Sequence, residues 1–416
     1  MYKEIKKCRI CGNANLATIL DLGNQYLTGI FPPNNKYDLT SGPLELVKCM
    51  DDGRGEACGL VQLRHSYDSE EMYGENYGYR SGLNQSMVRH LQQKVQNILK
   101  KVKLSDGDVV LDIGSNDSTL LQAYPHYNID LIGMDPTGKK FKDYYPSYIK
   151  LVPDFFSAAT FKKIFGDKKA KIITSIAMFY DLASPLDFVQ DIYNSLDEQG
   201  VWVFEQSYLL SMLDANAYDT VCHEHLEYYG IKQIKWMCDK IGFRILDIEI
   251  NNINGGSFSV MVCKKNAPYK DNAGQITELL ETERKRELHT LAPYKDFEKR
   301  VKKHKTELLE FIGSLKKKNK KILGYGASTK GNVVLQYCGL TPDDIPFIAE
   351  VNKDKFGCYT PGTNIPIISE SEAKKMKPDY LLVLPWHFKE NILFREKEYL
   401  AEGGKFIFPL PEIEVV

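Results

Sequence analysis

Apolar residues follow three different patterns along this chain. Near the N-terminus, short runs such as LELVKC and CGLVQLRHS are typical of β-strands. From about residue 107 to 264, strand-length apolar runs (DVVLDIG, LIGMDP, KIITSIAMF, GVWVFEQ) alternate with helix-length stretches, which predicts a doubly wound α/β sheet. Residues 271–320 are rich in Lys and Glu with apolar residues at helical intervals, and KILGYGASTKGNVVLQYC then gives strand, glycine turn and helix. We therefore expect an α/β protein with a small β-rich module, a doubly wound central unit and a C-terminal unit that contains a strand, a glycine turn and a helix.

Length and charge limit the organisation and the partners. A chain of 416 residues exceeds what one hydrophobic core usually supports, and we predict domains at 1–66, 67–265 and 266–416. The 54 basic and 55 acidic residues nearly cancel, so no overall field favours nucleic acid or an anionic membrane. No signal-peptide pattern opens the chain, and no apolar run approaches the roughly 20 residues of a membrane span. We expect a cytoplasmic monomer with neither nucleic-acid nor membrane partners.

Four of the nine cysteines lie within the first 58 residues. Cys8 and Cys11 form a CxxC knuckle, and eight residues separate Cys49 from Cys58, so the second knuckle requires a loop insertion. Four thiolates predict a structural zinc, because they leave no open position for catalysis. The alternative is that the first pair are incidental thiols. An odd total of cysteines fits a reducing compartment better than a disulfide framework.

A tyrosine-rich loop precedes the expected central sheet. It contains Tyr67, Tyr73, Tyr77 and Tyr79, and the stretch NQSMVRHLQQKVQNILKKV that follows has the apolar spacing of a helix. So aromatic a loop fits either a seam between two domains or a lid over a ligand.

The first glycine-containing loop, VLDIGSNDS at residues 110–118, follows a predicted strand. One glycine is too few for a dinucleotide fingerprint, so an adenosyl ligand with an amino-acid tail fits better. We place Asp112, Gly114 and Asn116 beside that tail, with free N–H groups of a following helix nearby. Asp135, before Pro136, ends the next strand and is placed to accept both ribose hydroxyls. Alternatively, Asp135 only caps the turn that contains Pro136.

The second loop, ILGYGASTKGN at residues 322–332, is richer in glycine. Backbone N–H groups, two hydroxyls and one cation suit a diphosphate. The residues concerned are Gly324, Gly326, Ser328, Thr329, Lys330, Gly331 and Asn332. The spacing also permits a nicotinamide site, since Glu350 could close the second strand of a dinucleotide fold.

Together these motifs resemble the sugar-nucleotide C-methyltransferases of deoxysugar biosynthesis, which include C-3′-methyltransferases acting on 4-keto sugars. The resemblance runs through CxxCG, CGLVQL, YGYRSG, LDIGSND, VWVFEQSYL, HEHLEYY, NGGSF, GYGASTKGN, PGTNIPI and LPWHFKENI, in this order along the whole chain. It implies a zinc-binding N-terminal domain, a central Rossmann-like S-adenosylmethionine domain and a C-terminal Rossmann-like domain that helps to bind a nucleotide sugar. On this basis Tyr77 is assigned to the methyl-donor site and Tyr79 to the acceptor site, and the second loop is assigned to the nucleotide sugar.

Methylation of carbon requires a base, because a sugar carbon becomes nucleophilic only after losing a proton beside a ketone. HEHLEYY at residues 223–229 offers two histidines around a glutamate. We assign His225 as the base and Glu224 as an orienting or substrate-positioning group, with His223 next in line. The alternatives are a helix cap and, less favoured, an HxH metal site.

Three positions depart from the family pattern. Cys222 stands where a tyrosine is usual, Asp181 lies where a histidine is usual, and Asn254 also replaces a histidine. Tyr180 or Asp181 is a possible substitute in proton transfer. The predicted activity is methyl transfer to carbon of a nucleotide-linked 4-keto sugar. An O- or N-methyltransferase, or a non-catalytic binding protein, are the alternatives.

Overall fold

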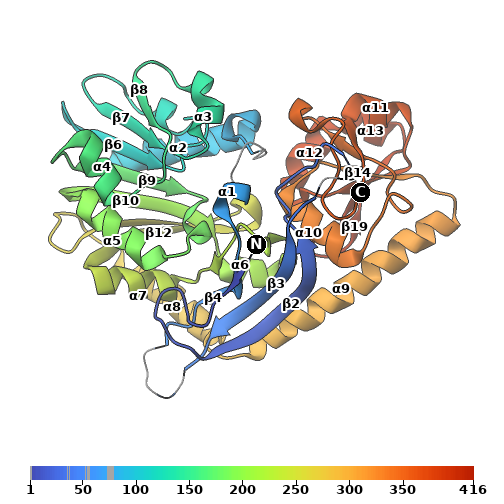
Figure 1. The fold of residues 1–416 in the computed structure, drawn as a ribbon, viewed down its shortest axis with the longest axis horizontal. Helices are drawn as coiled ribbons and strands as arrows, with labels where there is room; N and C mark the ends of the chain where they lie inside the picture. Colours follow the sequence, from blue (N-terminus) through green and yellow to red (C-terminus); the bar gives the residue numbers. More distant parts are fainter. Residues whose placement is uncertain (1, 35, 37, 52, 54–56, 73–78) are drawn as a thin grey trace.

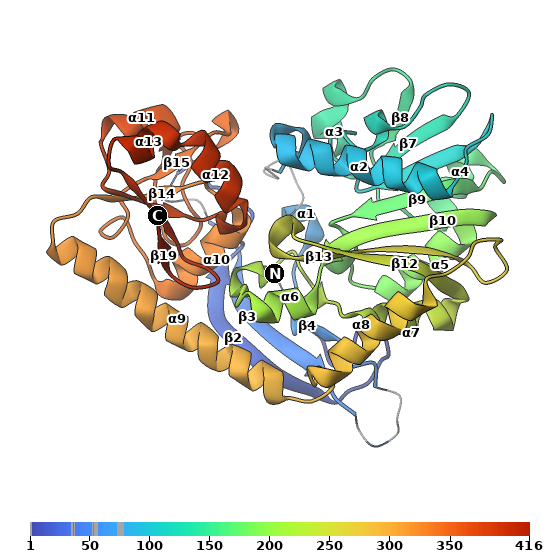
Figure 2. The same cartoon turned by 180° about the vertical axis from the view of Figure 1, so that it is seen from behind.

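The computed structural model describes residues 2–34, 36, 38–51, 53, 57–72 and 79–416. Three main sheets organise this part of the chain, and Figures 1 and 2 show the central sheet and the C-terminal sheet on opposite sides of a long N-terminal hairpin. Among the helices in the described ranges, none has the length and apolar character needed to cross a membrane.

The central sheet has seven strands in the order β12-β13-β10-β9-β6-β7-β8. Their bounds are Phe243–Asn251, Ser257–Lys264, Leu196–Ser207, Ala170–Ile176, Val109–Ile113, Asp130–Met134 and Ile149–Val152. The strands from β10 to β8 run parallel, as the sequence predicts, whereas β13 is antiparallel to both β10 and β12. The sequence patterns predicted neither the edge strand β8 nor the strands β12 and β13. Because β13 runs antiparallel to both of its neighbours, the sheet is mixed.

Helices cover both faces of this sheet because its strands are apolar on both sides. Val110 and Val203 pack with α2, Gln85–Lys101, in one core, whereas Leu111 and Phe204 belong to the core on the other face. Successive strand residues point to opposite faces, which explains the division. The helices of that second core are α4 Ala158–Phe165, α5 Pro185–Ser195 and α7 Ile231–Ile241. The prediction of a doubly wound α/β unit is confirmed.

One expected helix is absent from this described region. After β6 the sequence predicts a helix behind the first glycine loop, but the chain forms only a 3₁₀ turn at Leu121–Ala123. Asn116 and Ser118 have positive φ values of 49° and 63°, and Asp117 Oδ1 accepts hydrogen bonds from the N–H and hydroxyl of Thr119. Left-handed backbone and local side-chain bonding both compete with a helix. The N–H groups at this loop are therefore those of an irregular turn.

The N-terminal sheet has the order β11-β4-β3-β2, with strands Glu227–Tyr228, Val61–Leu63, Ser41–Cys49 and Leu16–Tyr26. A separate two-stranded ladder joins β1, Lys3–Glu4, to β5, His65–Ser66. The strands β3, β4 and β5 fall in the two predicted runs. The strand β11 comes from the HEHLEYY segment, so a piece of the middle of the chain completes the N-terminal sheet.

The C-terminal sheet has six strands in the order β16-β15-β14-β17-β18-β19. Their bounds are Ile367–Ser369, Ile348–Glu350, Ile322–Tyr325, Tyr380–Val383, Lys405–Phe408 and Glu414–Val415. All pair in parallel except the edge strand β19. The helices that accompany it are α10 Thr329–Cys338, α11 Glu370–Lys375, α12 Lys389–Arg395 and α13 Lys397–Ala401. The second Rossmann-like unit is thereby confirmed.

Two long elements connect the sheets. The helix α8, Ala273–Lys285, is followed by α9, Ala292–Lys317, which contacts β2 and buries residues including Tyr294 and Phe297. Most lysines of α9 are exposed, in agreement with the expected solvated face. The hairpin β2–β3 also reaches α10, where the N–H and C=O of Tyr26 bond to the side-chain amide of Gln336 at 2.8 and 3.1 Å. The hairpin and α9 run side by side beneath the other two sheets (Figures 1 and 2).

Candidate active site

A cleft of about 860 Å³ lies where the three parts of the chain meet. One wall comes from the carboxyl ends of β6, β7, β9 and β10, the edge at which doubly wound sheets bind ligands. A second wall comes from the loops after β14 and β15, and Gly29 and Phe31 contribute from the N-terminal part. Predicted donor, acceptor and catalytic residues therefore meet in one space.

The first glycine loop lines the central wall of the cleft. Gly114 has φ +70°, and an added Cβ would lie 3.0 Å from Cγ of Met178, so a side chain here would strain the backbone and crowd Met178. Asp135 Oδ2 accepts the N–H of Asn116 at 2.7 Å, and its Oδ1 accepts the N–H of Thr137 at 2.7 Å. Asp135 thus caps the local turn and also faces the cleft beside Pro136. Oδ1 also accepts the hydroxyl of Thr137 at 2.6 Å, so of the roughly four acceptor sites of a carboxylate one stays available, on Oδ2, for a ribose hydroxyl.

Asp112 is a buried carboxyl group at the end of β6. Burial raises its pKa to about 7, opposed by a 2.6 Å hydrogen bond from Thr174 and reinforced by the charge of Asp135. Two acids at one end of a cleft are best compensated by a cationic ligand. The ammonium and sulfonium groups of S-adenosylmethionine carry such charge, so the residues present fit this molecule.

Residues 326–330 of the second glycine loop line the opposite wall. Gly326 has φ +79°, and a Cβ there would lie 2.7 Å from Pro385, so glycine is required. Ser328 is the N-cap of α10, with its hydroxyl accepting the N–H of Gly331 at 3.0 Å. Glu350 accepts the N–H groups of Ala327, Val351 and Asn352 at 2.7–2.8 Å, so this acid braces the loop. This use of Glu350 weakens the alternative of a nicotinamide site.

His225 lines the cleft from the HEH loop, which we define as residues 221–226. Its Nδ1 lies 2.9 Å from the carbonyl oxygen of Thr220, which can only accept, so Nδ1 carries the proton and Nε2 has the lone pair. The ring lies against Tyr180, with centroids 4.3 Å apart. Burial, followed by the charge of Lys330, lowers the pKa of His225 to about 3, so the imidazole is neutral at physiological pH.

The other two residues of the motif have different surroundings. Glu224 lines the cleft, its Oε2 accepts a 3.4 Å hydrogen bond from Thr28, and burial raises its pKa. His223 is fully buried beneath the cleft, edge-on to Tyr67 with centroids 4.5 Å apart, and Thr28 Oγ1 lies 3.5 Å from its Nδ1. Of the two histidines, His225 alone lines the cleft, which favours it as the base.

Among the remaining predicted residues, Tyr79, Tyr180, Asp181, Ser328, Thr329 and Lys330 line the cleft. Three second-loop residues, Gly324, Gly331 and Asn332, do not belong to the lining of the described cleft. A Cβ on Gly324 would collide with Ile348, so this glycine serves strand packing, and Asn332 donates from Nδ2 to the carbonyl oxygen of Thr28 at 2.8 Å. Tyr77 lies outside the described residues. Cys222 is buried, and burial raises the pKa of its thiol well above the ordinary value.

Sequence reasoning missed several residues that line the cleft. Lys355 donates to the carbonyl oxygen of Ala327 at 2.8 Å and lies over the ring of Phe31, and burial lowers its pKa. His387 and Arg395 come from the C-terminal part. The sequence did contain a signal for two of these residues. Lys355 lies shortly after Glu350, the acid that ends β15, and His387 belongs to the LPWHFKENI motif.

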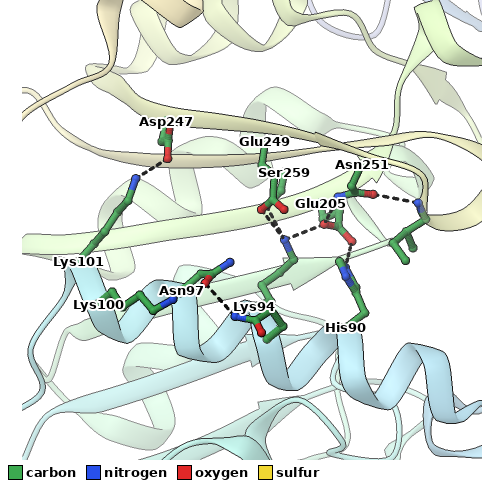
Figure 3. Close-up of polar contacts among 12 residues, drawn as sticks. His90, Lys94, Asn97, Lys100, Lys101, Glu205, Asp247, Glu249, Asn251 and Ser259 are labelled. Carbon is green, nitrogen blue, oxygen red and sulfur yellow. Dashed lines mark hydrogen bonds and ion pairs between the residues drawn. The ribbon is translucent and has the colours of Figure 1, made fainter.

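Glu205, at the end of β10, was also missed and anchors the central wall. It lies 2.6 Å from Nε2 of His90 and 2.7 Å from Nζ of Lys94, and Figure 3 shows both side chains reaching it from α2. Asn251 donates to its Oε2 at 2.9 Å, and Lys94 also donates to Ser259 at 2.8 Å. Burial opposes ionisation, but His90 and Lys94 hold the pKa of Glu205 below its ordinary value. The network fixes α2 and both ends of the 251–259 segment to the sheet.

The four N-terminal cysteines form a separate cluster. Their Sγ atoms all lie within 4.8 Å of one another, with Cys8 to Cys58 and Cys11 to Cys49 at 3.5 Å. Zinc–sulfur bonds of about 2.3 Å in a tetrahedron require sulfur separations close to these. The donor set fits one structural Zn²⁺, held by four cysteines, as predicted.

Family models match three consecutive parts of the chain. A zinc binding domain matches residues 8–73, a methyltransferase domain residues 84–248 and a C-methyltransferase C-terminal domain residues 252–411. The C-methyltransferase NovU of Streptomyces niveus is 27% identical over 419 residues, covering 100% of this chain and 98% of NovU.

Solved methyltransferase structures resemble parts of the chain. The CurJ carbon methyltransferase has a TM-score of 0.33 and 12% identity, covering 44% of this chain and 56% of CurJ. The plantazolicin methyltransferase BpumL in complex with SAH has a TM-score of 0.34 and 10% identity, covering 42% of this chain and 82% of BpumL.

Proposed function

Because the chain belongs to a family of S-adenosylmethionine-dependent C-methyltransferases with a zinc-binding module, we propose that it methylates a ring carbon beside the ketone of a nucleotide-linked 4-keto sugar. The observation that carries the proposal is that His225 lines the same cleft as the Asp112–Asp135 wall and the second glycine loop. Donor and acceptor sites on two sides of one base match the needs of C-methylation.

The donor residues hold a cationic adenosyl ligand. Asp112 and the backbone at Gly114 bind the amino-acid end, and Asp135 accepts a ribose hydroxyl. When bound, S-adenosylmethionine supplies an electrophilic methyl group. The chain contributes charge compensation and orientation at this wall.

The acceptor residues bind a diphosphate at the start of α10. The first N–H groups of a helix have no intrahelical acceptors, and the helix dipole favours negative charge there. Ser328 and Thr329 add hydroxyl groups, and Gly326 permits close approach of the phosphate. Lys355 also lines this wall, as does Arg395, which is paired with Glu370 and Glu396.

His225 removes the proton beside the ketone. Its neutral state and its fixed tautomer keep the Nε2 lone pair ready, and Tyr180 limits rotation of the ring. Glu224, next to it, orients the acceptor through a hydroxyl group. Deprotonation gives an enolate whose carbon is the nucleophile.

The test is incubation with isotopically labelled S-adenosylmethionine and a panel of nucleoside diphosphate 4-keto-6-deoxyhexoses. Label bound to a ring carbon of one of them is the expected result. Label on oxygen or nitrogen would replace the proposal with O- or N-methylation, and no transfer to any member of the panel would overturn the sugar class.

A further inference from the structure

Lys330 connects the C-terminal part of the chain to the central part inside the cleft. It is the second residue of α10, and its Nζ donates to the carbonyl oxygen of Asn254 at 2.9 Å. A lysine ammonium has three N–H donors, so two stay available for other acceptors. The Lys330 ammonium lies at the central wall of the cleft, whereas the backbone N–H groups of Ser328 and Thr329 lie at the opposite wall.

The first turn of α10 lies against the HEH loop. A Cβ on Gly29 would collide with Oε1 of Glu224 and lie 3.6 Å from Oγ1 of Thr329, so these two side chains border the same glycine. Thr28 joins both segments, because its hydroxyl donates to Glu224 and its carbonyl accepts from Asn332. Lys330, next to Thr329, therefore shares the part of the cleft that contains the proposed base.

Four titratable groups face the Lys330 ammonium. Burial, followed by the charge of Lys330, lowers the pKa of His225 and of His387. Burial raises the pKa of Asp219 and Cys222, and the charge of Lys330 opposes both shifts. Asp219 is bonded to Trp386 at 2.8 Å. The ammonium is therefore a cation among buried groups, where an anionic oxygen would be strongly stabilised.

The carbonyl that holds Lys330 is itself fixed. Asn254 has φ 53° in a tight turn, and Asn251 and Ser259 on either side bond to Glu205 and Lys94 (Figure 3). An anchored acceptor places the ammonium before the acceptor sugar arrives, and preorganised charge is more effective than mobile charge.

We propose that Lys330 is a catalytic residue that binds the ketone oxygen of the acceptor and stabilises the enolate oxygen, an inference that rests on the proposed function. In this step Nε2 of His225 takes the proton from the ring carbon. The C–H pair becomes the C=C bond, the carbonyl π pair moves to oxygen, and that oxygen is held by the Lys330 ammonium. This role replaces the diphosphate contact that the sequence predicts for Lys330.

The experiment measures enolisation alone. Wild type and the variants Lys330→Met, Lys330→Arg and Lys302→Met are incubated in D₂O with S-adenosylhomocysteine and thymidine diphosphate-4-keto-6-deoxyglucose, and NMR follows loss of the ring protons beside the ketone. Lys302 pairs with Glu298 on the exposed face of α9 and is the matched control. Affinity for thymidine diphosphate, which has no sugar, is measured by calorimetry.

At saturating sugar we expect Lys330→Met to slow exchange by about 10²–10³-fold, with Lys330→Arg in between and Lys302→Met at the wild-type rate. The affinity for thymidine diphosphate should change by less than about threefold, since one lost transition-state contact leaves ground-state binding intact. Lys330→Gln, which retains a donor for Asn254, replaces the Met variant if thermal melting shows that variant to be unfolded.

Two results would overturn the proposal in different ways. Wild-type exchange in Lys330→Met at saturation, with affinity for thymidine diphosphate weakened about tenfold or more, would return Lys330 to the diphosphate site and leave the proposed function standing. No exchange by the wild-type enzyme with this sugar, together with no methyl transfer to the panel, would reject the proposed function and the Lys330 role with it.

Discussion

Nε of Arg9 lies 3.5 Å from Oε1 of Glu227, and both side chains are almost completely buried. Arg9 sits inside the CxxC knuckle, between Cys8 and Cys11, and Glu227 follows His225 by two residues. Arg9 also donates to the carbonyl oxygen of Leu63 at 2.6 Å, on the strand that pairs with β11. The zinc module and the proposed base are therefore connected through one buried ion pair.

Replacing one partner of this pair should lower the free energy of unfolding more than replacing both. Arg9→Met leaves Glu227 as an isolated buried carboxyl, and we expect the free energy of unfolding to fall by about 3–5 kcal/mol. The double variant Arg9→Met/Glu227→Leu should recover part of this loss. Urea denaturation at constant zinc content measures both, and a double variant no more stable than Arg9→Met would contradict the pairing.

Loss of zinc should loosen the HEH loop as well as the knuckles. Cys49→Ser or chelation removes one ligand or the metal, and we expect a lower Tm together with faster hydrogen exchange at residues 223–228. Hydrogen-exchange mass spectrometry reads this directly, with Cys358→Ser outside the cluster as the control. Protection of 223–228 that is unchanged in the zinc-free chain would show that the module is independent of the loop.

Asp112 should make donor binding depend on pH. Its pKa is raised from 3.8 to about 7, so between these values the folded chain holds a proton that the unfolded chain has released. The free energy of unfolding that Asp112 contributes therefore falls as pH rises through this window. A cationic donor prefers ionised Asp112. As pH rises towards 7, the Kd of the donor should therefore fall by up to about tenfold per pH unit, and above pH 7 it should level off.

Calorimetry with S-adenosylmethionine between pH 5.5 and 8 checks this, using roughly half-unit steps below the plateau. Asp112→Asn is the comparison, because the amide keeps the shape and cannot ionise. Parallel pH profiles for the two proteins would exclude Asp112 as the titrating group.

His225 should be needed for chemistry and not for donor binding. His225→Asn retains a hydrogen bond to the Thr220 carbonyl but lacks a basic nitrogen, so kcat should drop by about 10²–10⁴-fold. The Kd of S-adenosylmethionine should stay within about threefold, because the proposed donor contacts are made by Asp112 and Asp135 and not by His225. His223→Asn, at the buried histidine, should lower Tm and reduce kcat much less than His225→Asn does. A larger loss of kcat in His223→Asn than in His225→Asn would exchange the two assignments.

The strongest local patterns predicted the sheets and the two glycine loops, because strand ends, N-caps and left-handed glycines depend on neighbouring residues. The helix expected after β6 is absent because Asn116 and Ser118 adopt positive φ values. Their side chains permit this conformation but do not require it, so the sequence does not predict it. The pairing of β11 with β4 joins residues more than 160 positions apart, and the groups around Lys330 come from separate segments that include residues 219–225, Asn254 and His387. Such contacts arise from tertiary packing and leave no periodic signal.

The β2–β3 hairpin limits how chimeras between this chain and similar methyltransferases can be built. Tyr26 and Thr28 hold Gln336 and Asn332 of α10, and Thr28 also reaches Glu224. A chimera that exchanges only residues 266–416 for those of a similar C-methyltransferase would keep the recipient's hairpin against a foreign helix. With the acceptor bound as proposed, a change of substrate would therefore require exchange of the hairpin and the C-terminal part together.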